Sequence, residues 1–263
     1  MNNIKVSFIV CTYSKELFPE TLECLNSLTK QDHINKEILL VMDKNDELYK
    51  MFLKSIPASV NILINTNPGL SEARNLGIKN AKGEIIVFID DDAYADKNYL
   101  PNLIKNYEEP NVAGVVGKIL PKEKPGYPEE LYWIGGFTYK GFPQVRCEVR
   151  NGHGCNMSFR KEVFEKAGLF DVKLGRVGKK LVTAEETEFS IRVLNSFPGS
   201  KIIYDPEVIV YHKVHEYRQG IGYMMKRGYF EGMSKAHIEG MYKGRDGGIR
   251  RLFHYLEFCI PLC

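Results

Sequence analysis

Three adjacent aspartates, Asp90, Asp91 and Asp92, directly follow the apolar run EIIVFI. Neighbouring carboxylates repel one another and resist burial, so a purely structural role explains such a run poorly. A bound cation removes the repulsion, and carboxylate oxygens are hard ligands that suit Mg²⁺ or Mn²⁺. Such a cation can neutralise the charge on a leaving nucleotide diphosphate. The aspartates alone leave a metal site and a solvated acidic loop equally open.

A second acidic cluster, EETE at residues 185–188, opens a segment with helical spacing. A carboxylate in this position can act as a general base. Acidic residues in a first turn also favour the helix dipole, and both interpretations can hold together. His212 and His215 follow a strand-like run, where a lone histidine is more often structural than functional.

The segments that position these residues alternate between strand-like and helix-like patterns. Buried strands are predicted over 6–12, 37–42, 60–65 and 84–89, with a helix opened by Pro19 and another from an N-cap at Ser71 to Asn80. This alternation predicts an α/β fold with a doubly wound, mostly parallel sheet and helices on both faces. Residues 121–154 read as loops and short antiparallel strands. Further helices are expected over 161–167, 185–194 and 217–238, and two short strands around Ile202 and Val208.

Five ordered blocks of the chain resemble the family 2 glycosyltransferases: VSFIVCTYSKE, VMDKND, NPGLSEARNLGIKNAKGEIIVFIDDDA, GCNMSFRKEVFEKAGLFD and EETEFSIRV. The match extends from about Val6 to Ala236, and several ordered blocks are more specific than any one of them. The resemblance implies a GT-A fold and inversion of the anomeric centre. It also divides the chain into a catalytic domain over 1–215, with a nucleotide-sugar half over 1–120 and an acceptor half over 121–215, and a helical extension over 216–263.

Carried over to this sequence, the resemblance assigns several residues to the donor nucleotide. Thr12 and Tyr13 follow the first strand and would flank the nucleobase, and Asp43 would meet the edge of the base, with a helix cap as the alternative. Gly69 and Arg74 would meet the nucleotide and its phosphates, because arginine presents a planar fork of donors suited to phosphate.

The resemblance also assigns the acidic run. Asp90 and Asp92 match the two acids of the D-x-D motif, Asp90 towards the ribose and Asp92 on the metal, with Asp91 in a supporting role. His212 occupies a position where the family often places a histidine near the metal and diphosphate, and His215 is the weaker candidate.

Glu186 would be the general base that takes the proton of the acceptor hydroxyl, with Glu188 as the fallback, because the family commonly has Glu-Asp where this chain has Glu185-Glu186. Glu185 and Asn156 are placed near the donor sugar and acceptor. Trp133 could stack on a sugar ring or be an ordinary core residue, and the second is favoured. A processive Q-x-x-R-W motif needs a late tryptophan, so the chain, with Trp133 alone, is expected to add one sugar.

The expected reaction is metal-dependent transfer of a sugar from a nucleotide-sugar, UDP-linked by the habit of the family, to a saccharide or lipid-linked acceptor, with Mn²⁺ or Mg²⁺ as cofactor. A nucleotidyltransferase should carry a glycine-rich basic loop where this chain reads CTYSKELFPE. A non-catalytic nucleotide- or sugar-binding relative should lack the acids at 90, 92 and 186. A net charge of +3 gives no argument for a nucleic-acid partner.

The six cysteines form no C-x-x-C pair and no run of 18 apolar residues is present, so reduced thiols, a cytoplasmic location and no membrane span are expected. Apolar residues recur at helical spacing at 249, 252, 253, 256 and 260, beside Arg250 and Arg251. This pattern predicts an amphipathic helix that either packs on the domain or lies at the inner face of the cell membrane as a peripheral contact.

Overall fold

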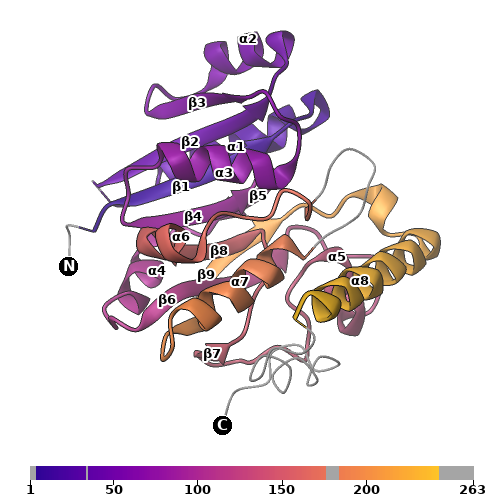
Figure 1. Cartoon of the computed structure of the whole chain (residues 1–263). Coiled ribbons are helices and arrows are strands. Elements are labelled where there is room, and N and C mark those ends of the chain that lie inside the picture. Colours follow the sequence, from indigo (N-terminus) through magenta and orange to yellow (C-terminus); the bar gives the residue numbers. More distant parts are fainter. Residues whose placement is uncertain (1–3, 34, 176–183, 243–263) are drawn as a thin grey trace.

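The computed structural model describes residues 4–33, 35–175 and 184–242 and has one mixed sheet with helices on both faces (Figure 1). The strand order is β3-β2-β1-β4-β8-β6-β9-β5, with β7 paired to β9 off this path. The strands are β1 (Val6–Thr12), β2 (Lys36–Asp43), β3 (Val60–Asn65), β4 (Ile85–Asp90), β5 (Ala93–Ala95), β6 (Val112–Pro121), β7 (Cys147–Val149), β8 (Asn156–Arg160) and β9 (Lys201–His212). The α/β class expected from the sequence is confirmed.

Strands β3, β2, β1 and β4 are parallel, and β8 runs antiparallel to β4 and β6. Strand β9 is parallel to β6, and both β5 and β7 pair with it in the antiparallel sense. The carboxyl ends of β1, β2 and β4 therefore meet at the same edge of the sheet.

The helices are α1 (Phe18–Thr29), α2 (Asp46–Ser55), α3 (Leu70–Asn80), α4 (Tyr99–Asn106), α5 (Tyr132–Gly135), α6 (Lys161–Ala167), α7 (Glu185–Ser196) and α8 (Ile221–Tyr242). Short 3-10 turns occupy Lys15–Leu17, Glu129–Leu131 and Glu216–Arg218. Side chains that alternate along β1, β2 and β4 separate two cores, because successive residues of a strand point to opposite faces. One core packs against α1, α2 and α4, and the other against α3, α6 and α7.

Several predicted elements are confirmed, including strands 6–12 and 60–65 and helix 161–167. The two short strands predicted around Ile202 and Val208 are wrong, because they form the single strand β9. Its register against β6 shifts between Gly117 and Lys118, and this irregularity accommodates Pro206, which cannot donate a ladder hydrogen bond. Helix α2, helix α4 and strand β6 were not predicted.

The predicted N-cap at Ser71 is also wrong, because α3 begins earlier and Gly69 caps it with a φ of 141°. Only glycine adopts that backbone conformation readily. Ser71 lies inside the helix and is buried.

The predicted amphipathic segment 249–263 lies outside the described residues. Among the helices that the structure describes, none combines the length and apolar character needed to cross a bilayer.

Candidate active site

Three of the predicted site residues meet where parallel strands end. Thr12 closes β1, Asp43 closes β2 and Asp90 closes β4, and the register places Cys11 beside both Val41 and Asp90. Open α/β sheets bind their ligands outside the carboxyl ends of their strands. The topology therefore gathers these side chains at the edge where a ligand is expected.

The acidic run is divided between surface and interior. Asp90 is half-buried, whereas Asp91 and Asp92 are only 7% and 8% exposed. Burial and the neighbouring Asp92 raise the pKa of Asp91 well above its usual range, although a hydrogen bond from Thr12 opposes the shift. Among the described residues no group pairs with Oδ2 of Asp91. An unpaired buried carboxylate oxygen beside two further acids is an environment that a cation would stabilise.

Both histidines reach Asp92. His212 Nε2 lies 3.2 Å from Oδ1 and His215 Nε2 lies 2.7 Å from Oδ2. Burial alone would raise the pKa of Asp92, but His212, His215 and Arg218 outweigh it and hold the pKa below its usual range. These neighbours favour the ionised form of Asp92, and His215 lies closer to it than His212, the histidine that the sequence favoured.

A set of potential metal donors lies beside this pair. An oxygen of Asp90, the thiol sulfur of Cys155 and a ring nitrogen of His212 all lie within 4.8 Å of one another. Carboxylate and imidazole are ordinary ligands of divalent cations, and a thiol adds a softer donor. The predicted ligand His212 is thus within reach of Asp90 as well as Asp92, and Cys155 is a candidate donor that the sequence did not indicate.

Asp43 contacts the loop that leads into α3. Its Oδ1 accepts a 2.7 Å hydrogen bond from Nδ2 of Asn65, and the backbone N–H of Gly69 also donates to its carboxylate. Burial raises the pKa of Asp43 while these two donors oppose the shift. The alternative role of helix cap falls to Asn45, whose side chain accepts from the backbone of Leu48.

Thr12 and Tyr13 differ in exposure. Thr12 is buried and its hydroxyl lies 3.5 Å from that of Thr21. Tyr13 is 68% exposed, directly after β1. An exposed aromatic ring next to the carboxyl end of a strand offers a flat face to a ligand at that edge.

Arg74 and Glu185, predicted as two separate ligand contacts, pair with each other. Arg74 Nη1 lies 2.6 Å from Oε1 of Glu185, and Nη2 lies 3.3 Å from the carbonyl oxygen of Gly154 and 3.7 Å from Asp90. A side chain at residue 154 would place its Cβ 2.7 Å from Nη2 of Arg74, so glycine is needed for this approach. Both charged side chains are nearly fully buried. This ion pair joins α3 to the first turn of α7.

Glu186 is half-buried in the first turn of α7, next to that ion pair. Burial and the adjacent Glu185 raise its pKa well above the usual range, and Glu231 on α8 adds to the shift while Arg74 opposes it. A carboxylate that holds its proton strongly is a better base once it is ionised. Glu186 is therefore a half-buried carboxylate that holds its proton more tightly than an ordinary glutamate.

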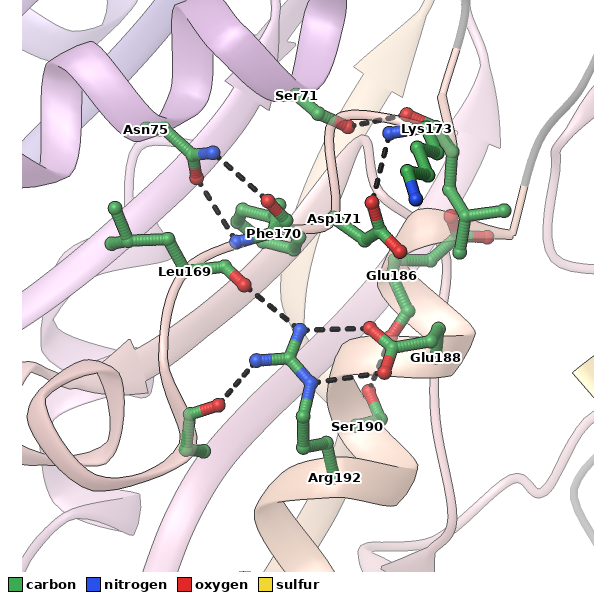
Figure 2. Close-up of polar contacts among 12 residues, drawn as sticks. Ser71, Asn75, Leu169, Phe170, Asp171, Lys173, Glu186, Glu188, Ser190 and Arg192 are labelled. Atoms are coloured by element: carbon green, nitrogen blue, oxygen red, sulfur yellow. Dashed lines mark hydrogen bonds and ion pairs between the residues drawn. The ribbon is translucent and has the colours of Figure 1, made fainter. Parts of the chain in front are cut away.

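Glu188 is not available for the role of fallback base. It is 3% exposed, and Arg192 contacts both of its oxygens, at 2.9 Å from Nε and 2.7 Å from Nη2 (Figure 2). The hydroxyl of Tyr242 donates a third hydrogen bond, of 2.9 Å. Three donors satisfy this carboxylate, so its role is structural.

Residues 168–175, which follow α6 directly, are held from two sides (Figure 2). From α3, Asn75 bonds both the N–H and the carbonyl oxygen of Phe170, at 3.0 and 2.9 Å, and Ser71 donates to the carbonyl oxygen of Leu174 at 2.8 Å. From α7, Arg192 donates to the carbonyl oxygen of Leu169 at 2.8 Å. These contacts place a loop of irregular backbone firmly against both helices.

The two remaining residues predicted to meet the sugar are Asn156 and Trp133. Asn156 is 1% exposed, and its side chain bonds the carbonyl oxygens of Lys118 and Val208 and accepts from the hydroxyl of Tyr99. These contacts hold the irregular β6–β9 pairing and give Asn156 a structural role, while its predicted contact with the sugar stays a prediction. Trp133 is half-buried on α5, which contacts α8.

The sequence did not indicate Asn65, Asn75, Cys155, Arg192 or Tyr242. Arg192 could have been found, because it stands four residues after Glu188, the spacing at which helical side chains of opposite charge meet. The others depend on contacts across 22 to 95 residues of chain, which no local pattern reveals.

Comparison with known proteins gives concordant matches. A profile described as "Glycosyl transferase family 2" matches residues 7–168. The chain is 33% identical over 247 residues to a glucosyl-dolichyl phosphate glucuronosyltransferase of Haloferax volcanii, with 91% of this chain and 79% of the relative covered.

Among solved structures, the mannosyltransferase PcManGT of Pyrobaculum calidifontis, in complex with GDP-Man and Mn²⁺, gives a TM-score of 0.68 at 19% identity, covering 95% of this chain and 68% of that one. TarS 1-349 of S. aureus, in complex with UDP-GlcNAc, gives a TM-score of 0.63 at 19% identity, covering 94% and 69%. The chain spans 41% of the longer TarS structure. At such identities these likenesses show a shared fold, the GT-A fold of glycosyltransferases.

Proposed function

Because the chain belongs to glycosyltransferase family 2, we propose that it transfers one sugar from a nucleotide-sugar to an acceptor hydroxyl, with inversion and with the help of a divalent cation. The observation that carries the proposal is that one buried ion pair links two acidic centres. Arg74 lies 3.7 Å from Asp90 and pairs with Glu185, which directly precedes Glu186 in the first turn of α7.

In the proposed reaction Glu186 accepts the proton of the acceptor. The acceptor oxygen forms a bond to the anomeric carbon, while the bond from that carbon to the diphosphate oxygen breaks and its electron pair leaves with the nucleotide diphosphate. A single displacement inverts the anomeric centre. The raised pKa of Glu186 supports this role, because proton transfer is more favourable to a stronger base.

The nucleotide is proposed to lie over the ends of β1 and β2. The ring of Tyr13 would face the base, and Thr12, Asp43 and Gly69 would border it. The contact between Asp43 and the backbone of Gly69 supports this assignment, because it brings the ends of β2 and of the α3 loop together. UDP is the proposed nucleotide from the habit of the family, although proteins of this fold have been solved both with GDP-Man and with UDP-GlcNAc.

A divalent cation, when bound, supplies positive charge to the leaving diphosphate. Asp90, Asp92 and His212 would hold it, with Cys155 within reach of two of them. The donor set fits Mn²⁺ or Mg²⁺ through its carboxylates, and the unpaired oxygen of Asp91 supports a cation in this place. His215 would orient Asp92, as a second histidine bonded to the same carboxylate.

The acceptor is proposed to be lipid-linked, by analogy with the relative that acts on a glucosyl-dolichyl phosphate. A peripheral membrane contact through residues 249–263 would bring such an acceptor within reach. Deletion of 249–263 should then reduce co-sedimentation with anionic vesicles while nucleotide binding persists. A sharply lowered melting temperature with unchanged sedimentation would refute the membrane contact.

The experiment that tests the function has two stages. Nucleotide diphosphates and nucleotide-sugars are screened by thermal shift with Mn²⁺, with Mg²⁺ and with chelator, because ligands of the native state raise its melting temperature. The stabilising donor is then incubated with polyprenyl-phosphate and saccharide acceptors, and the product is followed by mass spectrometry. Glu186→Gln should retain donor binding and lose transfer. Transfer by Glu186→Gln at the parent rate would refute the proposed base.

A further inference from the structure

The residue before the two acids of α7 has an unusual backbone. Ala184 is the one non-glycine residue with a positive φ in the described parts of the chain, at φ 82° and ψ 19°. A left-handed conformation places the Cβ of an L-residue against its own backbone, so it persists only where surrounding contacts enforce it. Ala184 is also the N-cap residue of α7, and its carbonyl oxygen accepts from the N–H of Glu188 at 2.9 Å. The turn at Ala184 therefore sets the direction in which α7 begins.

Helix α8 contributes to the packing around this turn. Ala184 and Ile191 of the α7 region form one buried apolar cluster with Ile238 and Tyr242 of α8. All four are at most 6% exposed. In Figure 1, one end of α8 lies next to α7, and the described part of α8 ends at Tyr242. The last described turn of α8 thus belongs to the same buried cluster as the strained residue.

A polar contact accompanies this packing. The Tyr242 hydroxyl donates to Oε1 of Glu188, the same buried carboxylate that Arg192 holds by two hydrogen bonds. Arg192 in turn donates to the backbone of Leu169, as Figure 2 shows. Glu188 therefore receives donors from α8 on one side and, through Arg192, is tied to the loop 168–175 on the other.

We propose that Tyr242 is a positioning residue for the reaction: through its hydrogen bond to Glu188 and its packing on Ala184, it fixes the first turn of α7 and so the place of the Glu186 carboxylate. The inference rests on the proposed role of Glu186 as the base. It makes the last turn of α8 part of the catalytic apparatus, with Tyr242 acting on Glu186 through the backbone of α7. A small displacement of a base costs rate far more than it costs substrate binding.

The pKa of Glu186 reports where its carboxylate lies, because the pKa depends on burial and on nearby charges. Three charged groups act on the Glu186 carboxylate. Glu185 on α7 and Glu231 on α8 raise its pKa, and Arg74 on α3 lowers it. Tyr242→Phe changes none of these charges. A shift in the acid limb of the pH profile of kcat would therefore report a change in the place of the carboxylate. Relaxation towards solvent should move that limb to lower pH, because both burial and the proximity of Glu185 would diminish.

The test compares Tyr242→Phe with Tyr229→Phe, the same substitution on a 66% exposed residue of the same helix. Tyr242→Phe should lower kcat about tenfold and leave the Kd for nucleotide diphosphate within about twofold. It should also move the acid limb of the kcat profile to lower pH. Tyr229→Phe should match the parent. Ala184→Gly should restore much of the lost kcat in the Tyr242→Phe background, because glycine adopts a positive φ without enforcement.

A normal kcat and pH profile in folded Tyr242→Phe would overturn the proposal, and so would a loss of kcat that Ala184→Gly does not relieve. If Tyr242→Phe does not fold, Ile238→Val carries the same test, because it shortens the contact with Ala184 by one methylene. Glu186→Gln, measured in parallel, separates the two hypotheses. An active Glu186→Gln refutes the base itself, whereas an inactive Glu186→Gln with normal Tyr242→Phe refutes only the positioning role.

Discussion

The buried ion pair between Arg74 and Glu185 offers the sharpest test of the packing between α3 and α7. Arg74 is 2% exposed and Glu185 is 4% exposed, and Nη1 and Oε1 are 2.6 Å apart. Replacing Arg74 by Met leaves an uncompensated carboxylate in the interior, which costs about 3–5 kcal/mol of folding free energy. Oε2 of Glu185 has no partner among the described residues, so nothing there takes over from Arg74.

The double variant Arg74→Met/Glu185→Met should recover most of that loss, because an apolar pair of similar volume needs no compensation. We expect each single variant to be destabilised by at least about 3 kcal/mol and the double by about 1 kcal/mol or less relative to the parent. For a chain of this size each kcal/mol lowers the melting temperature by about 2–4 °C, so a single variant should melt roughly 10 °C below the parent.

The assay is urea unfolding of the parent, both single variants and the double variant, followed by far-ultraviolet circular dichroism. Lys140→Met is the matched control, because its ion pair with Glu130, at 3.5 Å, is exposed on both sides and should be worth less than about 1 kcal/mol. If the losses in the two single variants simply add in the double variant, the two side chains do not interact and the reasoning is refuted.

Three further predictions concern the site and its supporting loop. The acid limb of kcat/KM should lie above pH 4.5, the ordinary glutamate range, because activity requires Glu186 to be ionised and its pKa is raised by burial and by Glu185. Glu186→Gln should remove this limb and lower kcat at least about a hundredfold, as measured by initial rates. Asn75→Ala should cost about 2–4 kcal/mol in urea unfolding, because it breaks both hydrogen bonds to Phe170, whereas the exposed control Asn80→Ala should cost under about 1 kcal/mol. Asp92→Ala should abolish the difference in nucleotide diphosphate affinity between Mn²⁺ and chelator by calorimetry, and a difference that persists would contradict its place on the metal.

The sequence predicted what depends on local pattern. The strands 6–12 and 60–65 and the helix 161–167 are as expected, because short runs rich in β-branched and apolar residues and a terminal glycine are reliable local signals. The acids at 90–92 are brought to the carboxyl edge because that position follows from the alternation of strands and helices. Thr12, Asp43 and Asp90 therefore meet as expected, although their roles stay predictions.

The sequence interpretation fails where contacts between residues far apart in the sequence determine the structure. Pro206 looks like a strand break, but β6 accommodates it at an irregularity in the pairing. The sequence did not indicate the structural role of Asn156, in which two backbone carbonyl oxygens from other strands use both of its amide hydrogens. Glu186 and Glu188 are the same residue type and differ in their surroundings, since Arg192 and Tyr242 hold the carboxylate of Glu188.

The way in which α3 holds its neighbours also sets how this protein can diverge. Asn75 bonds only backbone atoms of Phe170, so the side chains at positions 171–173 can change without disturbing that contact. Arg74 and Glu185 bond through their side chains and can be lost only together. Among homologues, position 75 should remain asparagine while positions 171–173 drift, and positions 74 and 185 should covary. During selection for a new acceptor, the residues at 171–173 beside Glu186 can therefore be replaced one at a time, whereas Arg74 and Glu185 cannot.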